Sequence, residues 1–237
     1  MEVASLYREP PKQEERAPAA LEFHDVFKIF RSGPVETVAL RGLDLRIDAG
    51  EFVAVLGPSG SGKSTFLHLA AGLDEPSAGE VRAFGKPLSR LDEAGLARYR
   101  SRDVALVFQS ENLLPLLTAE ENVATIVRLS GSRRWRESVD DALTLVGLRE
   151  RGTHRPGALS GGEQQRTAVA AAAARTAPLL LADEPTGELD LDNERRVLGA
   201  LRGLQAERGT TVVTVTHSPA FASAADRVIE IRDGRVA

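Results

Sequence analysis

Four short apolar runs, each ending at polar residues, constrain the fold more than any other feature of the chain. The runs are "FVAVLG", "VALVFQ", "PLLLADE" and "TTVVTVTH", and they end at Gly57, at Gln109, at Asp183 with Glu184, and at His217. Near-continuous runs of Val and Leu separated by longer helical patterns are typical of a parallel sheet covered by helices on both faces. Ligands of such sheets bind beyond the carboxyl ends of the strands. The sequence therefore predicts an α/β fold in which the four polar endings meet at one site.

The residues before the first run predict a different kind of sheet. Residues 21–30 ("LEFHDVFKIF") and 38–51 ("VALRGLDLRIDAGE") alternate apolar and polar side chains, as half-buried antiparallel strands do. The tail "RVIEIRDGRVA" has the pattern of a hairpin with a turn at Asp233 and Gly234. We therefore expect an N-terminal antiparallel β subdomain and a small C-terminal hairpin.

A helical insert is expected between Gln109 and Ser160, where the pattern becomes helical ("ESVDDALTLVGL"). We place its outer bounds at about residues 96–160 and assign residues 21–237 to one nucleotide-binding domain. Residues 1–20 are polar and proline-rich ("REPPKQEERAPAA") and have no apolar run, so they predict a flexible arm.

Composition excludes several classes of protein. Of the 237 residues, 42% are hydrophobic and 27% are charged, which is ordinary for a globular chain. Cysteine is absent and the four histidines are scattered, which argues against disulfides and against a zinc site. A net charge of -4 argues against a surface that neutralises a nucleic-acid backbone, so we expect no nucleic-acid partner. The apolar stretch around Arg175 and Pro178 is too short to cross a bilayer.

The segment "GPSGSGKST" follows a predicted strand and opens a predicted helix, which is the context of a phosphate-binding loop. Its glycines let backbone N–H groups turn toward phosphate oxygens. Lys63 supplies a positive charge for the β- and γ-phosphates, and Ser64 offers a hydroxyl to Mg²⁺. The predicted phosphate-binding residues are Gly57, Pro58, Ser59, Gly60, Ser61, Gly62, Lys63, Ser64 and Thr65.

The other strand ends supply the remaining chemistry of a nucleotide site. Asp183 is predicted to lie beside Mg²⁺, and Glu184 to polarise the attacking water. The amide oxygen of Gln109 can reach the metal or the water. His217 could hydrogen-bond a terminal phosphate, although a lone histidine is more often a local cap. Phe30 could stack on an adenine face, and a buried core position is the competing interpretation.

A leucine-rich segment follows Gln109. Leu113 to Leu117 read "LLPLL", which is unusually apolar for a loop. These leucines either pack the helical insert or form a docking surface for another chain, and the sequence leaves both alternatives open.

The stretch "LSGGEQQR" predicts a second anion-binding feature. Ser160 and Glu163 form a capping box before an alanine-rich run, so the helix begins with exposed N–H groups next to Gly161 and Gly162. Side chains in place of these glycines would hold a phosphate away. Because the phosphate loop already serves one nucleotide, two such surfaces suggest two chains. A head-to-tail pair, closed by two-fold symmetry, brings each phosphate loop opposite the partner's Ser160 helix.

In this order and at these separations, "GPSGSGKST", Gln109, "LSGGEQQR", "LLLADEPTGELD" and His217 resemble the nucleotide-binding subunit of ATP-binding cassette (ABC) transporters, a class of P-loop NTPase. The resemblance covers residues 21–237. "VFQSENLLPLLTAEENV" and "ADEPTGELD" resemble the branch that includes lipoprotein-release, macrolide-export and cell-division ATPases.

This resemblance implies an ATPase that uses ATP and Mg²⁺ and powers a separate transmembrane permease, as a peripheral protein at the cytoplasmic face of the plasma membrane. It implies that Phe30 stacks on adenine and that Ser160 and Gly162 grip the γ-phosphate of the opposing subunit. It also implies that Asp190 couples the two sites and that the Gln109 region touches the permease. Mechanical signalling through a membrane partner is the alternative to transport. An ATPase acting on nucleic acid or protein assemblies and a P-loop kinase or GTPase are the rival classes.

Overall fold

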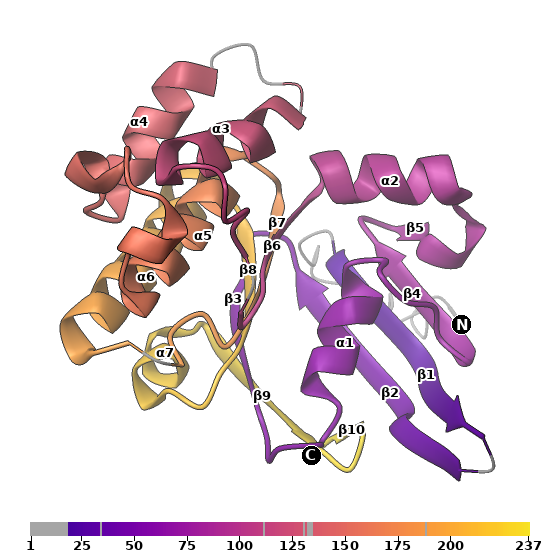
Figure 1. Ribbon diagram of the computed structural model, residues 1–237. Coiled ribbons are helices and arrows are strands. Elements are labelled where there is room, and N and C mark those ends of the chain that lie inside the picture. The colour runs from indigo at the N-terminus through magenta and orange to yellow at the C-terminus, as the bar shows by residue number, and fades with distance from the viewer. Residues whose placement is uncertain (1–18, 34, 111, 130, 132–134, 188) are drawn as a thin grey trace, which may run out of the picture.

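The computed structural model describes residues 19–237 except residues 34, 111, 130, 132–134 and 188. Nearly all of the predicted arm, residues 1–20, therefore lies outside the described residues. The elements form successive layers (Figure 1): an antiparallel sheet, helix α1 (Lys63–Ala70), a mostly parallel sheet and a layer of helices.

The mostly parallel sheet has six strands in the order β10-β9-β3-β8-β7-β6. Strand β3 pairs in parallel with β8 and β9, and β7 pairs in parallel with β6 and β8. The four predicted apolar runs form β3, β6, β7 and β8, which confirms the predicted fold class. The bounds of the strands are β3 (Phe52–Leu56), β6 (Val104–Val107), β7 (Leu179–Asp183), β8 (Thr211–Val215), β9 (Arg227–Arg232) and β10 (Arg235–Val236).

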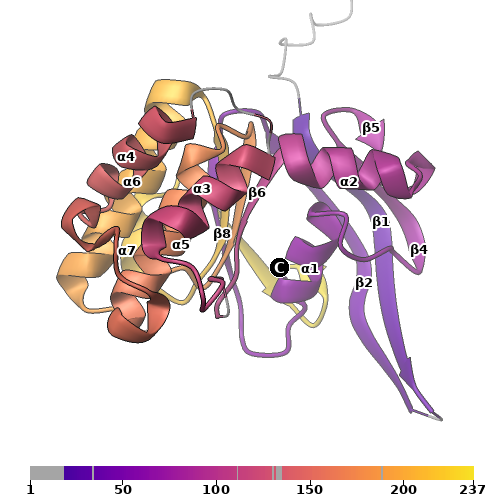
Figure 2. The ribbon, with the colours of Figure 1, turned by 45° about the horizontal axis from the view of Figure 1, so that its top comes forward.

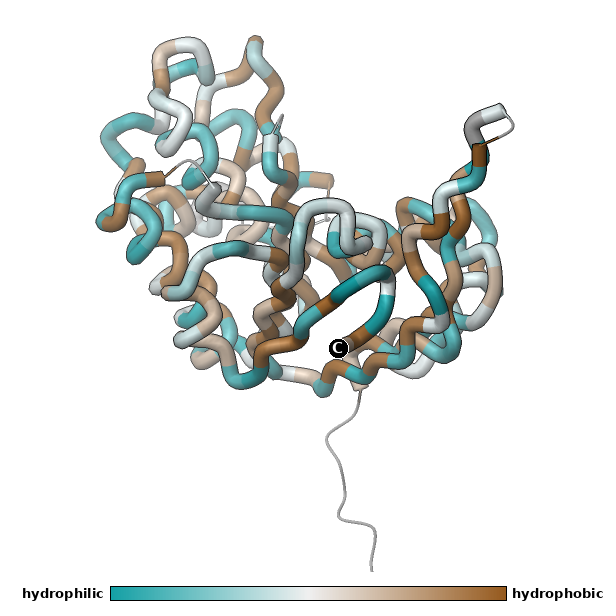
Figure 3. The backbone as a smooth tube through the Cα atoms, turned by 90° about the horizontal axis from the view of Figure 1, so that it is seen from below, coloured by the Kyte–Doolittle hydropathy of each residue, from teal (hydrophilic) through white to brown (hydrophobic). Residues whose placement is uncertain are grey.

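Strands β3 and β6 are wholly apolar and β7 and β8 are nearly so, with Asp183, Thr211 and Thr214 as their polar residues, because both faces of the sheet are buried there. In β7, Leu180 and Ala182 pack in the core beneath the helices, whereas Leu179 and Leu181 pack in the core that faces α1 and the antiparallel sheet. Each fully buried leucine stabilises the fold by about 1.5–3 kcal/mol relative to an exposed one. The hydrophobic residues of these strands run through the middle of the molecule in Figure 3.

The antiparallel sheet has the order β2-β1-β4-β5. The two predicted strands are confirmed as β1 and β2. The sheet also contains β4 and β5, which the sequence pattern did not indicate. The rings of Phe23 and Phe66, whose centroids are 4.9 Å apart, pack α1 against this sheet. Figure 2 shows α1 between the two sheets. The bounds of the strands are β1 (Ala19–Ser32), β2 (Val35–Asp48), β4 (Ala78–Ala83) and β5 (Lys86–Pro87).

The helical layer covers the opposite face of the parallel sheet (Figures 1 and 2). It consists of α3 (Ala119–Leu129), α4 (Trp135–Leu145), α5 (Gly161–Ala174), α6 (Leu191–Arg208) and the short α7 (Pro219–Ala224). Helix α5 is central, and its small alanine side chains allow α3, α4 and α6 to approach it closely. No helix in the described part of the chain has the length and apolarity needed to span a membrane.

Strand β6 and helix α2 (Glu93–Arg102) overlap the range of about 96–160 that was expected for the helical insert, but they do not belong to the helical layer. Strand β6 belongs to the six-stranded sheet, and α2 lies on the side of α1 and the antiparallel sheet (Figure 2). The helices of that range which cover the parallel sheet begin at Ala119.

The C-terminal hairpin confirms the predicted Asp-Gly turn and supports the neighbouring elements. Asp233 and Gly234 have φ angles of 49° and 75°, as a type I′ turn requires. The N–H of Gly234 donates to the carbonyl of Ser61 at 3.0 Å, and the N–H of Arg41 donates to the carbonyl of Gly234 at 2.9 Å. The turn therefore joins β2 to the loop that precedes α1.

Candidate functional site

A pocket of about 630 Å³ lies at the carboxyl ends of the parallel strands. It brings together most of the residues predicted from the phosphate loop and all four strand-end residues. The predicted residues that line it are Ser59, Gly60, Gly62, Lys63, Ser64, Thr65, Gln109, Asp183, Glu184 and His217. The convergence predicted from the four polar endings is therefore present in the folded chain.

Two glycines of the phosphate loop are required by packing behind the loop. A Cβ at Gly57 would lie 2.1 Å from the carbonyl oxygen of Ile231, and one at Gly62 would lie 2.5 Å from that of Ala39. Both residues also have positive φ angles, 151° and 102°. Gly60 also has a positive φ angle, 77°, but a Cβ there would meet no atom within 4 Å. For Gly60 the predicted reason, a backbone that turns its N–H groups toward phosphate, is not replaced by packing, whereas contacts with β9 and β2 are a further reason for the other two glycines.

Lys63 crosses the base of the pocket. Its ammonium group donates to the carbonyl oxygens of Gly57 and Pro58, both at 2.8 Å, and its side chain is buried. Pro58 and Ser61 do not line the pocket, and the carbonyl of Pro58 also accepts the N–H of Ser61. These residues hold the loop in shape, and Lys63 is the one Lys or Arg side chain among the described residues that line the pocket.

Glu184 combines three features of a catalytic carboxylate. Its φ angle is 46°, a left-handed conformation that costs a non-glycine residue about 1–3 kcal/mol and that clusters at functional sites. Its Oε1 lies 3.2 Å from Nε2 of His217. Burial raises the pKa of the Glu184 carboxyl, and the charge and backbone N–H of His217 oppose this rise. A carboxylate with a raised pKa is suited to accept a proton.

The residues proposed for Mg²⁺ fit a hard cation that is shared with phosphates. Ser64, Gln109 and Asp183 all line the pocket and offer a hydroxyl, an amide oxygen and a carboxylate. Among the residues that the structure describes, no group of three or more His, Asp or Glu side chains could hold a metal by itself. Mg²⁺ in nucleotide sites uses few protein ligands and takes the rest from phosphates and water.

The pocket also contains polar residues that sequence reasoning missed. Thr186, Glu194 and Ser218 line it, together with Thr37 of β2. The hydroxyl of Ser218 donates to Glu194 and accepts the N–H groups of Ala220 and Phe221, so it caps α7. Thr186 and Ser218 directly follow the motifs "ADEP" and "TVTH", which is the signal that could have found them. Glu194 carried no such signal.

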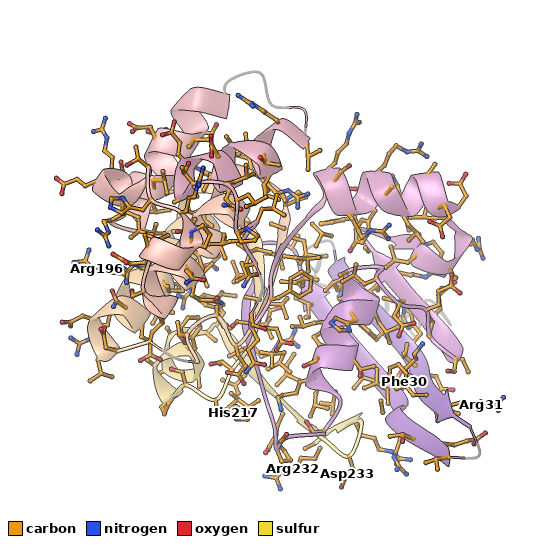
Figure 4. All side chains as sticks on the ribbon, in the orientation of Figure 1. Phe30, Arg31, Arg196, His217, Arg232 and Asp233 are labelled. Atoms are coloured by element: carbon orange, nitrogen blue, oxygen red, sulfur yellow. The ribbon has the colours of Figure 1, made fainter. Side chains whose placement is uncertain are left out.

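Phe30 lies beside the pocket and not in its lining. It is 44% exposed on β1, which excludes the buried core position, and it pairs across the ladder with Thr37, which does line the pocket. The ammonium of Lys28 lies 5.0 Å from the centre of its ring. Figure 4 shows Phe30 on the antiparallel sheet and His217 beyond α1 toward the helical layer. Stacking on adenine remains a prediction.

The start of α5 lies outside the pocket. Ser160, Gly161 and Gly162 do not line it, and the predicted capping box is present. The Ser160 hydroxyl accepts the N–H of Glu163 at 3.2 Å, and the Glu163 carboxylate accepts the N–H of Ser160 at 2.9 Å. This backbone hydrogen bond, assisted by Arg151, lowers the pKa of Glu163. First-turn N–H groups lack acceptors within a helix, which is why helix starts such as this one can bind anions.

Asp190 lies near this helix start and likewise outside the pocket. Its carboxylate caps α6 by accepting the backbone N–H of Asn193 at 2.8 Å and the side-chain amide of Asn193 at 2.9 Å. The amide oxygen of Asn193 in turn accepts from buried Arg166 of α5. A Cβ at Gly162 would lie 3.0 Å from Cδ2 of Leu189, so packing against this neighbouring loop is a second reason for that glycine.

The leucine-rich segment is exposed at some positions and half-buried at others. Leu114 and Leu116 are 55% and 79% exposed, whereas Leu113 and Leu117 are half-buried. Asn122 of α3 fixes the shape of the segment, because its buried amide accepts the N–H of Leu114 and donates to the carbonyls of Leu114, Leu117 and Thr118. The exposed leucines are therefore presented on a preformed loop.

Comparisons with known proteins extend over this whole arrangement. Residues 40–187 match the family model described as ABC transporter. An uncharacterized ABC transporter ATP-binding protein of Thermotoga maritima is 44% identical over 91% of this chain and 93% of that protein. The lipoprotein-releasing system ATP-binding protein LolD of Chromohalobacter salexigens is 42% identical over 91% of this chain and 92% of that protein.

Two further similarities concern a longer protein and a solved structure. The macrolide export ATP-binding/permease protein MacB of Rhodopirellula baltica is 43% identical over 92% of this chain, which spans only 32% of that protein. The dimeric structure of a post-hydrolysis state of the ATP-binding cassette MJ0796, bound to ADP and Pi, superimposes with a TM-score of 0.87. The two sequences are 38% identical, and the superposition covers 91% of this chain and 96% of that chain.

Proposed function

The chain belongs to the ABC transporter family and is an ATPase of that family, and from this premise we propose that it drives a separate transmembrane permease by hydrolysing ATP between two copies of itself. The observation that carries the proposal is the single pocket that joins the phosphate loop to the ends of four parallel strands. A charged donor, metal ligands and a proton acceptor are available there within one chain.

We assign the binding of the nucleotide to the loop before α1. Lys63 and the backbone N–H groups around Gly60 bind the phosphates, and Phe30 lies on the neighbouring strand where an adenine can stack on its exposed face. Ser64, Gln109 and Asp183 would hold Mg²⁺. When bound, Mg²⁺ supplies positive charge that stabilises the negative charge developing on the transferred phosphoryl group.

Glu184 orients the attacking water and accepts its proton. Its raised pKa and its position beside His217 suit this role, because the imidazole can hydrogen-bond both Glu184 and a terminal phosphate oxygen. The strained backbone of Glu184 places the carboxylate at the end of β7, next to the metal-facing Asp183.

Two copies complete the site in a head-to-tail arrangement. The start of α5 has the chemistry of an anion site but lies outside the pocket of its own chain. In the pair, Ser160 and Gly162 of one copy face the phosphates held by Lys63 of the other, and Asp190 lies near the boundary between the two sites.

The permease is the proposed partner of the loop that carries Leu114 and Leu116. Names of relatives include a permease and a lipoprotein-releasing system, which supports work at the cytoplasmic face of the plasma membrane on a lipophilic or peptide-like substrate. Mechanical signalling through a membrane partner uses the same machinery and is distinguished by the absence of a transported substrate.

The shared-site proposal is tested by particle mass. The Glu184→Gln variant is expected to bind MgATP without turnover and to accumulate as a dimer, so light scattering should show a doubled mass only when ATP and Mg²⁺ are both present. Glu207→Gln, an exposed position of α6, is the matched control and should remain a monomer under turnover. A Glu184→Gln protein that binds ATP and stays monomeric contradicts the proposal.

The permease proposal is tested by partition between membrane and soluble fractions in cells. Leu116→Glu should release the chain from membranes, because a charge replaces the most exposed leucine of the loop. Leu129→Glu, a similarly exposed leucine of α3, is the control and should remain with the membrane fraction. Equal release of both variants, or of neither, would contradict docking through this loop.

A further inference from the structure

Gln109 lies on a loop that side chains attach to helix α5. The amide oxygen of Asn112 accepts the backbone N–H of Phe108 at 2.8 Å, and the amide nitrogen of Asn112 donates to the carbonyl of Phe108 at 2.6 Å. Gln165 of α5 donates to the same carbonyl at 3.1 Å and accepts from Asn112 at 3.3 Å. The backbone N–H and the carbonyl of Phe108, the residue before Gln109, therefore both have side-chain hydrogen-bond partners.

The first two turns of α5 carry this attachment and the start of the helix together. Gln165 follows Ser160 by five residues, a distance of roughly 7 Å along the helix axis at 1.5 Å per residue. A helix moves as a rigid unit over such a length. Any displacement of the Ser160 end is therefore transmitted through Gln165 to Phe108, and from there to Gln109 in the pocket.

We propose that Gln165 and Asn112 are positioning residues that hold Gln109 in register with the start of α5. The proposal rests on the function proposed above, in which Gln109 faces the metal and Ser160 faces the nucleotide of the partner. It makes the metal-facing side chain of one site respond to the phosphates bound in the other, through hydrogen bonds within one chain.

The neighbouring residue provides a matched control. Gln164 is half-buried like Gln165 and donates two hydrogen bonds from its amide, to the carbonyls of Pro156 at 3.0 Å and Leu159 at 3.2 Å. These acceptors precede the capping box, and neither belongs to the loop of Gln109. Replacing Gln164 removes a similar number of hydrogen bonds from the same helix without touching Phe108.

The first test is hydrogen–deuterium exchange of the full chain without nucleotide. Asn112→Ala removes the acceptor of the Phe108 N–H, so this amide is expected to exchange about fivefold faster or more. Gln165→Ala should also accelerate its exchange, by a smaller factor, and Gln164→Ala should leave it at the wild-type rate. An unchanged Phe108 rate in Gln165→Ala, or an equal increase in Gln164→Ala, overturns the attachment.

The second test asks whether the attachment acts through Gln109. Gln165→Ala is expected to lower kcat several-fold, to leave KM for ATP near the wild-type value and to raise the Mg²⁺ concentration that gives half-maximal hydrolysis. In a Gln109→Ala background the same substitution should have no further effect, because the positioned side chain is already gone.

The outcomes separate this inference from the proposed function. Additive losses in Gln109→Ala/Gln165→Ala, with Gln109→Ala itself impaired, overturn the positioning role and leave the proposed function intact. An unimpaired Gln109→Ala protein removes Gln109 from the metal site of the proposed function and overturns the positioning role with it.

Discussion

The pocket before α1 and the start of α5 offer similar groups to an anion, but different residues surround them. Both are glycine-containing helix starts, but the first lies with the ends of β6, β7 and β8 in the lining of one pocket, whereas the start of α5 does not line that pocket. The first region holds Lys63, Asp183 and Glu184, whereas the second holds the Ser160 hydroxyl and the ion pair of Glu163 with Arg151. This difference is the basis of our proposal that one chain supplies the chemical groups of hydrolysis and that a second copy completes the phosphate contacts.

The largest expected effect comes from Glu184, the proposed proton acceptor of the pocket. Glu184→Gln should lower kcat by about 10²–10⁴-fold, the usual contribution of a general base, while ATP affinity is retained. Phosphate release and binding of a fluorescent ATP analogue measure the two quantities. A Glu184→Gln protein with wild-type turnover would place the proton acceptor elsewhere in the pocket.

Loss of Lys63, the cationic side chain of the phosphate loop, should weaken the binding of ATP. Lys63→Ala is expected to weaken ATP affinity by about 10–100-fold, because a hydrogen bond to a charged group contributes about 1.5–3 kcal/mol. Titration calorimetry with the isolated chain checks this. Lys86→Ala, on exposed β5, is the control and should bind ATP as the wild type does. If both variants bind equally well, the phosphate loop is not the nucleotide site.

A substitution at the start of α5 should spare binding and impair hydrolysis. Ser160→Asp keeps a good helix cap, so the free energy of unfolding should change little. Its negative charge should repel the phosphates of the opposing copy and lower kcat by about tenfold or more. Ser160→Asn, an equally good neutral cap, separates charge from cap geometry and should retain most of the activity. Weakened ATP binding by the isolated Ser160→Asp chain would mean that the two regions belong to one site.

The smallest expected effect concerns stability and pH. Because burial raises the pKa of Glu184 above that of an unfolded glutamate, the folded chain releases this proton at higher pH than the unfolded chain does. Stability from this group is therefore present below the ordinary range of about pH 4 and is lost as pH rises through the folded-state pKa.

The neutral Glu184→Gln side chain escapes this loss. Its Tm without nucleotide should exceed that of the wild type at pH 8, and the difference should shrink as pH approaches 4. The charges of His217, Asp183 and Lys63 act on the same carboxylate, so calorimetry of both proteins at each pH is the measurement. A difference that grows toward low pH would contradict the direction of the shift.

Local patterns predicted the elements that are defined by local physics. The four buried strands were visible because both faces of the sheet are covered, which makes most of their positions apolar. The Ser160 capping box and the Asp233-Gly234 turn are likewise encoded within a few residues. The convergence of Gln109, Glu184 and His217 followed from the rule that parallel strands end at one edge.

Features that depend on distant contacts were not predictable. Strands β4 and β5 are short, and β4 joins the sheet by pairing with β1, far away in the sequence, while β5 pairs with β4. The carbonyl of Ile231 that excludes a side chain at Gly57 comes from β9. Glu194 lines the pocket because α6 packs with the face that carries this residue toward the pocket. The sequence of α6 alone does not indicate which face that is. The attachment of Phe108 by Gln165 is of the same kind.

The central claim is that one nucleotide is held by two copies, and mixing two inactive variants tests it most directly. Lys63→Ala lacks the pocket cation and Ser160→Asp blocks the start of α5, so at ATP concentrations below the wild-type KM each alone should hydrolyse ATP at about a tenth of the wild-type rate or less. A mixed head-to-tail pair regains one intact site, and an equimolar mixture should therefore approach about a quarter of the wild-type rate. A mixture that never exceeds the average of its two components would show that each site is built from a single chain.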